Sequence, residues 1–248
     1  MKVANHSRVR AAPLPLRGSA PRPVWVITLL LVAIGLSAAS RRAYVLLLTQ
    51  PALNAPRFEA AAALDAGFAA HRTLTLLHIL PAFLFMALVP LQFVARIRER
   101  HIEWHRWSGR ILLLLGAVIG ATALVMSFSM NIGGVSETAA TTLFAILFLA
   151  FLGAGFWNIR HGRIALHREW MTRAFGVVLG IAATRPIIGA FFATGRLSPH
   201  EFFGAAFWLG FTITLLAAEA WIRYAEPRYR PETRLPSLPH SQIGGTSS

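Results

Sequence analysis

Six long apolar blocks constrain the fold of this chain more than any other feature of its sequence. A helix that crosses the hydrocarbon core of a bilayer needs about 20 mostly apolar residues. The blocks lack the alternation of barrel strands, and only helices or closed barrels satisfy their backbone in lipid, so we expect helices. The expected spans are 24–39 (which an extension through 43–48 would lengthen), 74–94, 111–130, 139–158, 174–193 and 202–224.

The composition supports a membrane protein. Hydrophobic residues make up 55% of the 248 residues and charged residues only 14%, whereas about a quarter of a soluble domain is charged. We therefore predict an all-α integral membrane bundle over residues 24–224, with disordered tails over 1–23 and 225–248. The chain has no cysteine, which excludes a disulfide scaffold, an iron–sulfur cluster and a thiol nucleophile.

The basic residues predict an orientation. Eighteen of the 24 Lys and Arg residues fall in the two tails and in the second and fourth connections, and five fall on the opposite side. The positive-inside rule then places both termini in the cytoplasm, and we expect a bacterial inner membrane. Arg41 and Arg42 oppose this orientation. A longer first helix with snorkelling arginines would accommodate them, and so would cleavage of a signal peptide after the small residues at 37–39.

The net charge of +14 raises the question of nucleic-acid binding. However, the arginines flank the apolar blocks, where they set membrane orientation and meet anionic headgroups. No basic groove with interleaved aromatic residues is apparent. We therefore expect the lipid bilayer to be the partner of this charge, with no nucleic acid bound.

Ionisable residues inside an apolar block are costly in lipid, so each is a candidate functional residue. His78 lies four residues into the second block, and Arg185 lies eight residues from the outer end of the fifth. Pro186 disfavours helical geometry at Arg185 and would free backbone groups. If the helix breaks there, Arg185 could bind an anionic or polar ligand. Alternatively, Arg185 donates a hydrogen bond to a freed carbonyl or to a Ser or Thr in the bundle. Glu219 is expected to pair with Arg223 in a structural role.

Histidines gather at the boundaries of the blocks. Neutral imidazole is the commonest transition-metal ligand, and two histidines can hold a haem iron. His71 and His78 lie about 10.5 Å apart along one helix, too far to share an iron. His105 and His167 could meet at the cytoplasmic mouths of their helices, and His71 could meet His200 outside. Interfacial anchoring beside tryptophans is the alternative for all of them.

No other block carries an internal histidine at the depth of His78, so a conventional two-haem arrangement is not expected. Met126 of the third block lies at a similar depth and could pair with His78, although a methionine there more often serves packing. We expect a polar pocket in the outer half of the bundle, built from His78 and Arg185 with hydrogen-bonding neighbours on the side of Gln92. The candidate haem or metal ligands are His71, His78, His105, His167 and Met126.

Common soluble-enzyme motifs are absent. The chain has no Walker loop, no dinucleotide fingerprint after a strand, no His-Glu-x-x-His and no serine-nucleophile elbow. Whether the protein is an enzyme stays open; if it is catalytic, we expect membrane redox chemistry.

The chain carries an ordered set of motifs, which are His71, His78-Ile79-Leu80-Pro81-Ala82, Leu91-Gln92-Phe93, His105-Arg106-Trp107-Ser108-Gly109-Arg110 and His167-Arg168-Glu169-Trp170-Met171-Thr172-Arg173. This set resembles a bacterial membrane-protein family, the domain-of-unknown-function family 2306. Arg185 would match an arginine late in the next helix, and the resemblance spans roughly 40–225. It implies a multi-pass membrane protein without a settled activity.

The boundary histidines also make the chain similar in pattern to di-haem cytochrome b-like bundles and to small proteins of haem–copper oxidase assembly. Fold analogy does not establish function. One hypothesis is therefore haem or metal binding in electron transfer or respiratory-complex assembly, with other membrane or respiratory proteins as partners. The alternatives are a transporter or binding protein that holds a small polar or anionic molecule at Arg185, and a structural subunit without a ligand.

Overall fold

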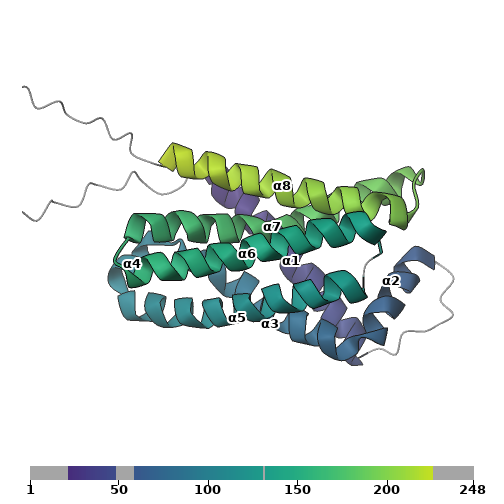
Figure 1. Ribbon diagram of the computed structural model, residues 1–248, viewed down its shortest axis with the longest axis horizontal. Coiled ribbons are helices and arrows are strands. Elements are labelled where there is room, and N and C mark those ends of the chain that lie inside the picture. Colours follow the sequence, from purple (N-terminus) through teal and green to yellow (C-terminus); the bar gives the residue numbers. More distant parts are fainter. Residues whose placement is uncertain (1–21, 49–58, 131, 226–248) are drawn as a thin grey trace, which may run out of the picture.

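The protein is a bundle of antiparallel helices (Figure 1). The computed structural model describes residues 22–48, 59–130 and 132–225, and every regular element in these ranges is an α-helix. Six of the helices are long and apolar enough to cross a membrane, as predicted. They are α1 (Arg22–Leu48), α3 (Arg72–Gln92), α5 (Ile102–Ser129), α6 (Gly134–Arg160), α7 (Ile164–Thr194) and α8 (Pro199–Ala225).

Two shorter helices lie in the connections. They are α2 (Glu59–Ala70) and α4 (Ala95–Arg100), and the apolar blocks gave no indication of either. The membrane helices are also longer than their blocks: α5 begins at Ile102 and α7 at Ile164, not at 111 and 174. An apolar block marks only the part of a helix that lies in hydrocarbon, because polar residues can continue the helix into the interface. The longer version of the first helix is confirmed, and the predicted tails lie almost entirely outside the described residues.

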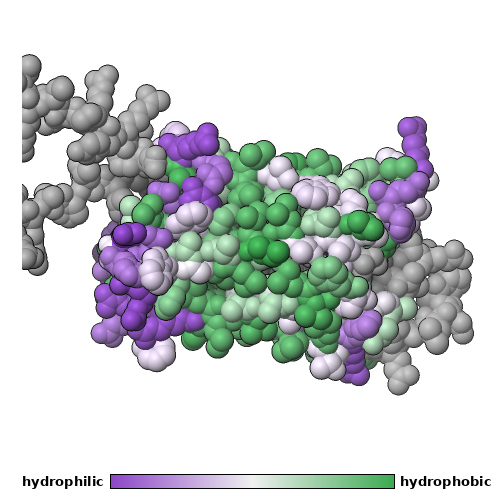
Figure 2. All heavy atoms as spheres, viewed as in Figure 1, coloured by the Kyte–Doolittle hydropathy of each residue, from purple (hydrophilic) through white to green (hydrophobic). Residues whose placement is uncertain are grey.

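The helices alternate in direction between two ends of the bundle. We call these the α4 end and the α2 end, after the short helix at each (Figure 1). Helix α1 begins and α8 finishes at the α4 end, as an even number of crossings requires. A hydrophobic belt separates hydrophilic residues at the two ends (Figure 2). This is the surface of a membrane-embedded bundle in contact with lipid.

Phenylalanines fill the core between α6, α7 and α8. The rings of Phe144 and Phe211 stack with centroids 4.7 Å apart, and those of Phe191 and Phe202 with centroids 5.1 Å apart. Phe202 is almost completely buried. Helix α1 lies at the edge of this core, and only Val32 and Leu46 along its length are buried. Helix α1 packs on α3 and α7 at this edge.

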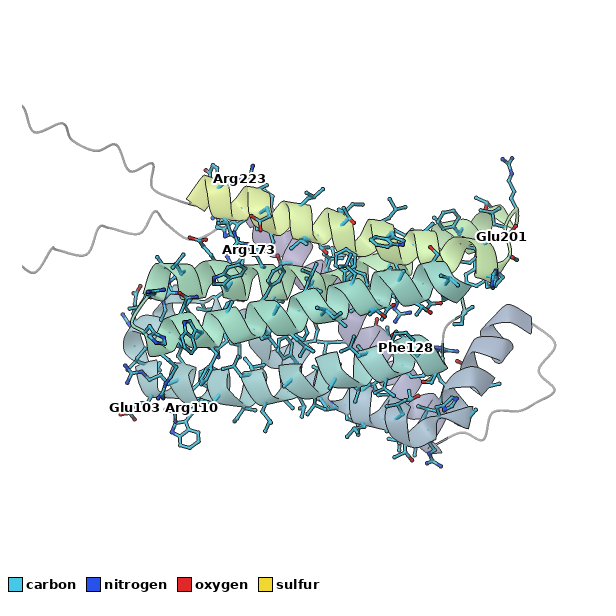
Figure 3. All side chains as sticks on the ribbon, viewed as in Figure 1. Glu103, Arg110, Phe128, Arg173, Glu201 and Arg223 are labelled. Carbon is cyan, nitrogen blue, oxygen red and sulfur yellow. The ribbon has the colours of Figure 1, made fainter. Side chains whose placement is uncertain are left out.

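Glu219 pairs with Arg173 of α7, and the predicted pair with Arg223 is wrong. Nη2 of Arg173 donates to Oε2 of Glu219 over 3.2 Å, and Nη1 donates to Glu169 over 3.4 Å. Arg173, early in α7, and Arg223, late in α8, both lie toward the α4 end of the bundle (Figure 3). Because α8 packs directly on α7, the carboxylate of Glu219 faces the neighbouring helix instead of its own next turn. The predicted structural role of Glu219 agrees with this interhelical contact.

Arg41 and Arg42 find their partner on α2. Both guanidinium groups donate to the carboxylate of Asp65, and Arg42 also lies 4.0 Å over the ring of Phe68. The arginines that opposed the predicted orientation are thus partly neutralised by an acidic residue, which snorkelling alone would not provide. The contact fixes α2 across the end of α1.

The Asp65 contact predicts a pH response. Burial alone would raise the pKa of Asp65, but hydrogen bonds and charge from Arg41 and Arg42 outweigh it and hold the pKa below its usual value. A carboxyl group whose pKa is lower in the folded than in the unfolded protein stabilises the fold at any pH above its unfolded pKa. This stabilisation is lost as the pH falls through the folded pKa. We therefore expect α2 to stay docked from neutral pH to about pH 4.

Asp65→Asn should release α2 at neutral pH. Hydrogen exchange of the α2 amides should become at least about threefold faster, while exchange in α6 and α7 stays unchanged. Unchanged α2 exchange would show that packing alone, without the ion pair, holds this helix.

Candidate functional site

His78 lies on α3, inside the bundle, and forms a hydrogen bond with a residue of α5. Its Nδ1 is 2.9 Å from Oγ1 of Thr122. The Thr122 hydroxyl is itself 2.7 Å from the carbonyl of Val118, as is common for threonine in a helix. Since one hydroxyl has one proton to give, the carbonyl takes it and the hydroxyl accepts from Nδ1–H. We assign the proton of His78 to Nδ1 on this basis, which leaves a lone pair on Nε2.

Thr122, and not Met126, is the hydrogen-bond partner of His78 on α5. Met126 lies one turn further along the same helix, and its pairing with His78 stays a prediction. Gln92 belongs to a different place: its Nε2 donates to Ser108 over 2.7 Å. It lies about 21 Å from His78 along α3, so the predicted extension of the pocket toward Gln92 is wrong.

Arg185 lies deep in α7, about 13 Å from the end of the helix at Thr194. Helix α7 continues through Pro186 without interruption, so the predicted break is wrong. Neighbouring helices can satisfy the backbone groups that proline frees, which is why proline is tolerated in membrane helices. The guanidinium makes no hydrogen bond or ion pair with any residue of the described ranges, although the side chain keeps exposed surface. The alternative partners considered from the sequence, a freed carbonyl or a Ser or Thr, are therefore not observed.

Charges of both signs lie around Arg185, but none of those described contacts it directly. It interacts electrostatically with Arg42, Glu137 and His78. The carboxylate of Glu137 already accepts hydrogen bonds from the backbone N–H groups of Ile132 and Gly133, at 2.7 and 2.6 Å. Arg42 adds a second positive charge. The geometry thus leaves Arg185 as a deep cation without a direct partner.

Two other candidate histidines lie at the α4 end. Nδ1 of His167 is 2.8 Å from the carbonyl oxygen of Gly155. A carbonyl can only accept, so Nδ1 carries the proton and Nε2 keeps its lone pair. Nδ1 of His105 is buried and has no hydrogen-bond partner. The two histidines interact electrostatically, which supports the expectation that they lie near one another.

The remaining candidates are more peripheral. His71 lies exposed at the N-cap of α3, without a side-chain cap bond. The ring of His200 lies against Gly134, and the described contacts include none between His71 and His200. Within the described ranges, no three His, Cys, Asp or Glu residues gather as metal ligands.

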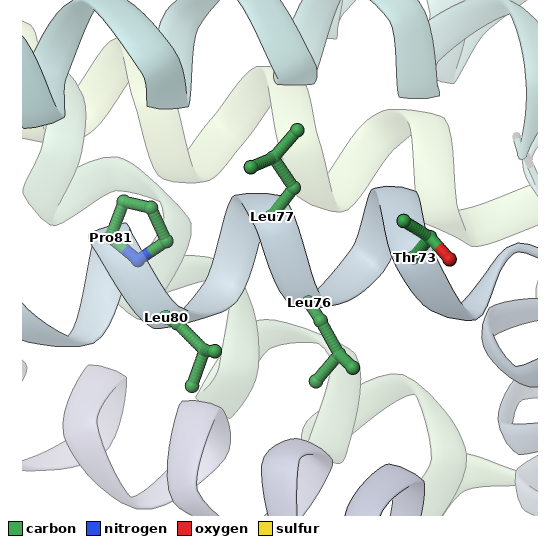
Figure 4. A pocket seen from close by; sticks show the side chains of 5 residues that line it. All are labelled: Thr73, Leu76, Leu77, Leu80 and Pro81. Atoms are coloured by element: carbon green, nitrogen blue, oxygen red, sulfur yellow. The ribbon is translucent and has the colours of Figure 1, made fainter.

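An open depression of about 410 Å³ lies along α3. Figure 4 shows the side chains that line it, which are Thr73, Leu76, Leu77, Leu80 and Pro81. They come from one helix and are mostly apolar, as expected for a lipid-facing surface. None of the polar candidate residues lies in this lining.

Comparison with known protein families identifies a family for this chain. A family described as predicted membrane proteins (DUF2306) matches residues 75–222. The chain belongs to this family. No curated protein and no solved structure matches it. The match confirms the resemblance found from the motifs and establishes a membrane protein, while the family description names no activity.

The part of the chain that matches the family contains the interior candidates His78, His105, His167 and Arg185, and His71 and α2 lie before it. Sequence reasoning missed three residues that shape the site: Asp65, Thr122 and Glu137. Thr122 lies within an apolar block and Glu137 just before one, so their polarity was a usable signal. Asp65 lies in a connection, where an acidic residue is unremarkable.

Proposed function

We propose that this membrane protein binds a small anionic molecule, carrying a carboxylate or a phosphate group, at Arg185. The observation that supports this is a guanidinium at membrane depth on α7 that is exposed and makes no hydrogen bond or ion pair with any described residue. A charged group at membrane depth is costly unless something compensates it. Arg41, Arg42 and Arg173 have carboxylate partners, whereas Arg185 lies at membrane depth without one among the described residues.

The chemistry of the surroundings fits an anion. A guanidinium presents five N–H donors in a fork that matches carboxylate and phosphate oxygens. Arg42 adds positive charge on the α2 side of Arg185, and the carboxylate of Glu137, which acts on Arg185, is hydrogen-bonded to backbone amides. The lone pair on Nε2 of His78 could accept a hydrogen bond from a hydroxyl of the same ligand. A hydroxycarboxylate would use all three groups.

The redox hypothesis is the second candidate. It rests on His105 and His167, since each keeps an unshared ring nitrogen at the α4 end. Three arginines act on His105, and no carboxylate of the described residues does, which disfavours a bare metal cation. His78 has a threonine partner instead of a second iron ligand. We therefore expect no Soret band from protein purified from haem-replete cells; a stoichiometric band lost in His167→Ala would favour the redox function.

The orientation and the compartment are also proposals. The α4 end carries the larger share of basic residues, and we propose that it faces the cytoplasm of a bacterial inner membrane. The α2 end, with Arg42 and Arg185, would then open to the outer side.

Anion binding can be tested by the thermal unfolding of the full chain in detergent. The probes are inorganic phosphate and the hydroxycarboxylate malate, with the neutral diamide of malate as the matched control. A ligand that binds only the folded state stabilises it by about 2.7 kcal/mol at a concentration 100 times its Kd. We expect one anion to raise the midpoint in a saturable way and the diamide to leave it unchanged.

The control variant is Arg196→Gln, since Arg196 is exposed at the same end of the bundle. Arg185→Gln should lower the affinity at least tenfold, because a charge-assisted hydrogen bond contributes about 1.5–3 kcal/mol. Arg196→Gln should change it less than twofold. Equal loss in the two variants would assign the effect to surface charge and reject the site at Arg185.

A further inference from the structure

A group of basic side chains at the α4 end is not used by the proposed anion site. Arg98 lies on α4, His105 and Arg106 in the first turns of α5, and His167 and Arg168 in the first turns of α7. We call these five residues the α4-end basic cluster. The other four members all act electrostatically on His105, and Arg98 acts on Arg168. Segments far apart in the sequence thus bring like charges to one place.

The arginines of the cluster have no carboxylate partner among the described residues. Arg98, Arg106 and Arg168 make no ion pair with a residue of the described part of the chain. Arg98 and Arg168 are nevertheless half-buried. Arg173, one turn and a half further along α7, shows the contrast, because it contacts both Glu169 and Glu219. Like charges held together without an acid are unfavourable unless an anion joins them.

The histidines of the cluster add unused hydrogen-bonding capacity. Nδ1 of His105 is buried without a partner in the protein, and burying an unpaired polar atom is unfavourable. Nδ1 of His167 is held by the carbonyl of Gly155, which fixes the ring. The cluster also lies at the beginnings of α5 and α7, where the helix dipoles are positive. The unpaired arginine charges and the positive helix dipoles therefore both favour the binding of an anion.

We propose that the α4-end basic cluster binds the phosphate group of an anionic lipid headgroup. Arg98 and Arg168 would hold the phosphate oxygens, and His105 would donate to them from Nε2, because its Nδ1 is fully buried. The position at the rim of the hydrophobic belt is where a headgroup lies while its acyl chains remain in the bilayer. A free phosphate ion has the same chemistry, so the test separates the two sources.

The test is native mass spectrometry of the full chain, purified in detergent and supplied with phosphatidylglycerol or phosphatidylcholine. Both lipids carry a phosphate, but only phosphatidylglycerol carries a net negative charge. We expect phosphatidylglycerol to be retained at least tenfold more tightly. The Arg98→Gln/Arg168→Gln double variant should lose this preference by at least tenfold. Arg163→Gln, which removes an exposed charge at the same end, should retain it within twofold.

His105→Gln is a second test in case the double variant fails to fold. We expect it to weaken the retention of phosphatidylglycerol about threefold or more. Competition by millimolar inorganic phosphate would support the phosphate site and assign it to the free ion, whereas no competition would assign it to the lipid. Equal retention of the two lipids would overturn the proposal. The proposal would also be overturned if Arg163→Gln lost as much of the preference for phosphatidylglycerol as the double variant does. A nonspecific belt of basic residues would then explain the retention.

Discussion

Replacing Arg185 by methionine should make the ligand-free protein more stable, whereas the same replacement of Arg173 should make it less stable. Arg185 has no direct partner among the described residues, so Arg185→Met removes an uncompensated charge and keeps much of the side-chain volume. A charged side chain at the centre of a membrane helix costs about 2.5–3.5 kcal/mol on insertion scales, and methionine avoids this cost. We expect about 1–3 kcal/mol, which would raise the midpoint of thermal unfolding by several degrees.

Arg173→Met is the matched comparison on the same helix. Arg173 contacts Glu169 and Glu219, and its removal would leave two partly buried carboxylates without their cation. Breaking a buried pair from one side costs about 3–5 kcal/mol, and partial exposure should reduce this to about 1–3 kcal/mol. The measurement is thermal unfolding of both variants in the same detergent, without added anion.

The sign of the Arg185 effect is decisive. If Arg185→Met lowers the midpoint as Arg173→Met does, the guanidinium has a stabilising partner within the protein and the proposed ligand is unnecessary. If the midpoint rises, the positive charge is kept at a cost to stability, as is usual for groups that serve binding. An anion that stabilises the unchanged protein should then have no effect on Arg185→Met, which connects the stability measurement to binding.

The bundle could be predicted from the sequence because lipid leaves the backbone few options. A run of about 20 apolar residues in hydrocarbon must satisfy its backbone internally, so all six membrane helices follow from the blocks alone. Helices α2 and α4 lie in connections, where no such constraint acts. The predicted break at Pro186 failed for a related reason: the preference against proline is local, while the packed neighbours of α7 determine whether the helix continues.

The depths of the candidate residues were easier to predict than their partners. The depth of Arg185 and His78 follows from their positions in the blocks, because a helix rises by a constant amount per residue. The contacts of Glu219 with Arg173 and of His78 with Thr122 depend on how two helices are rotated toward one another. That rotation is set by the whole aromatic core, so spacing along one helix does not reveal it.

A close approach of α7 and α8 determines part of this rotation, and it should be very sensitive to one methyl group. A Cβ added at Gly180 would lie 2.4 Å from Cδ1 and 2.8 Å from Cα of Phe211. A Cβ added at Gly210 would lie 2.9 Å from the carbonyl oxygen of Gly180 and 3.0 Å from the backbone N of Thr184. Backbone atoms cannot move aside as flexible side chains can, so α7 and α8 would have to separate.

Gly180→Ala should therefore destabilise the bundle by about 1–3 kcal/mol, the usual cost of overpacking. Gly189→Ala is the matched control on the same helix, since a Cβ there would meet nothing within 4 Å. Alanine favours a helix over glycine by up to about 1 kcal/mol, so the control should be neutral or slightly stabilised in thermal unfolding. Equal midpoints for the two variants would show that α7 and α8 are not in direct backbone contact. Because Thr184 adjoins Arg185, Gly210→Ala should also weaken anion binding, while Gly189→Ala should preserve it.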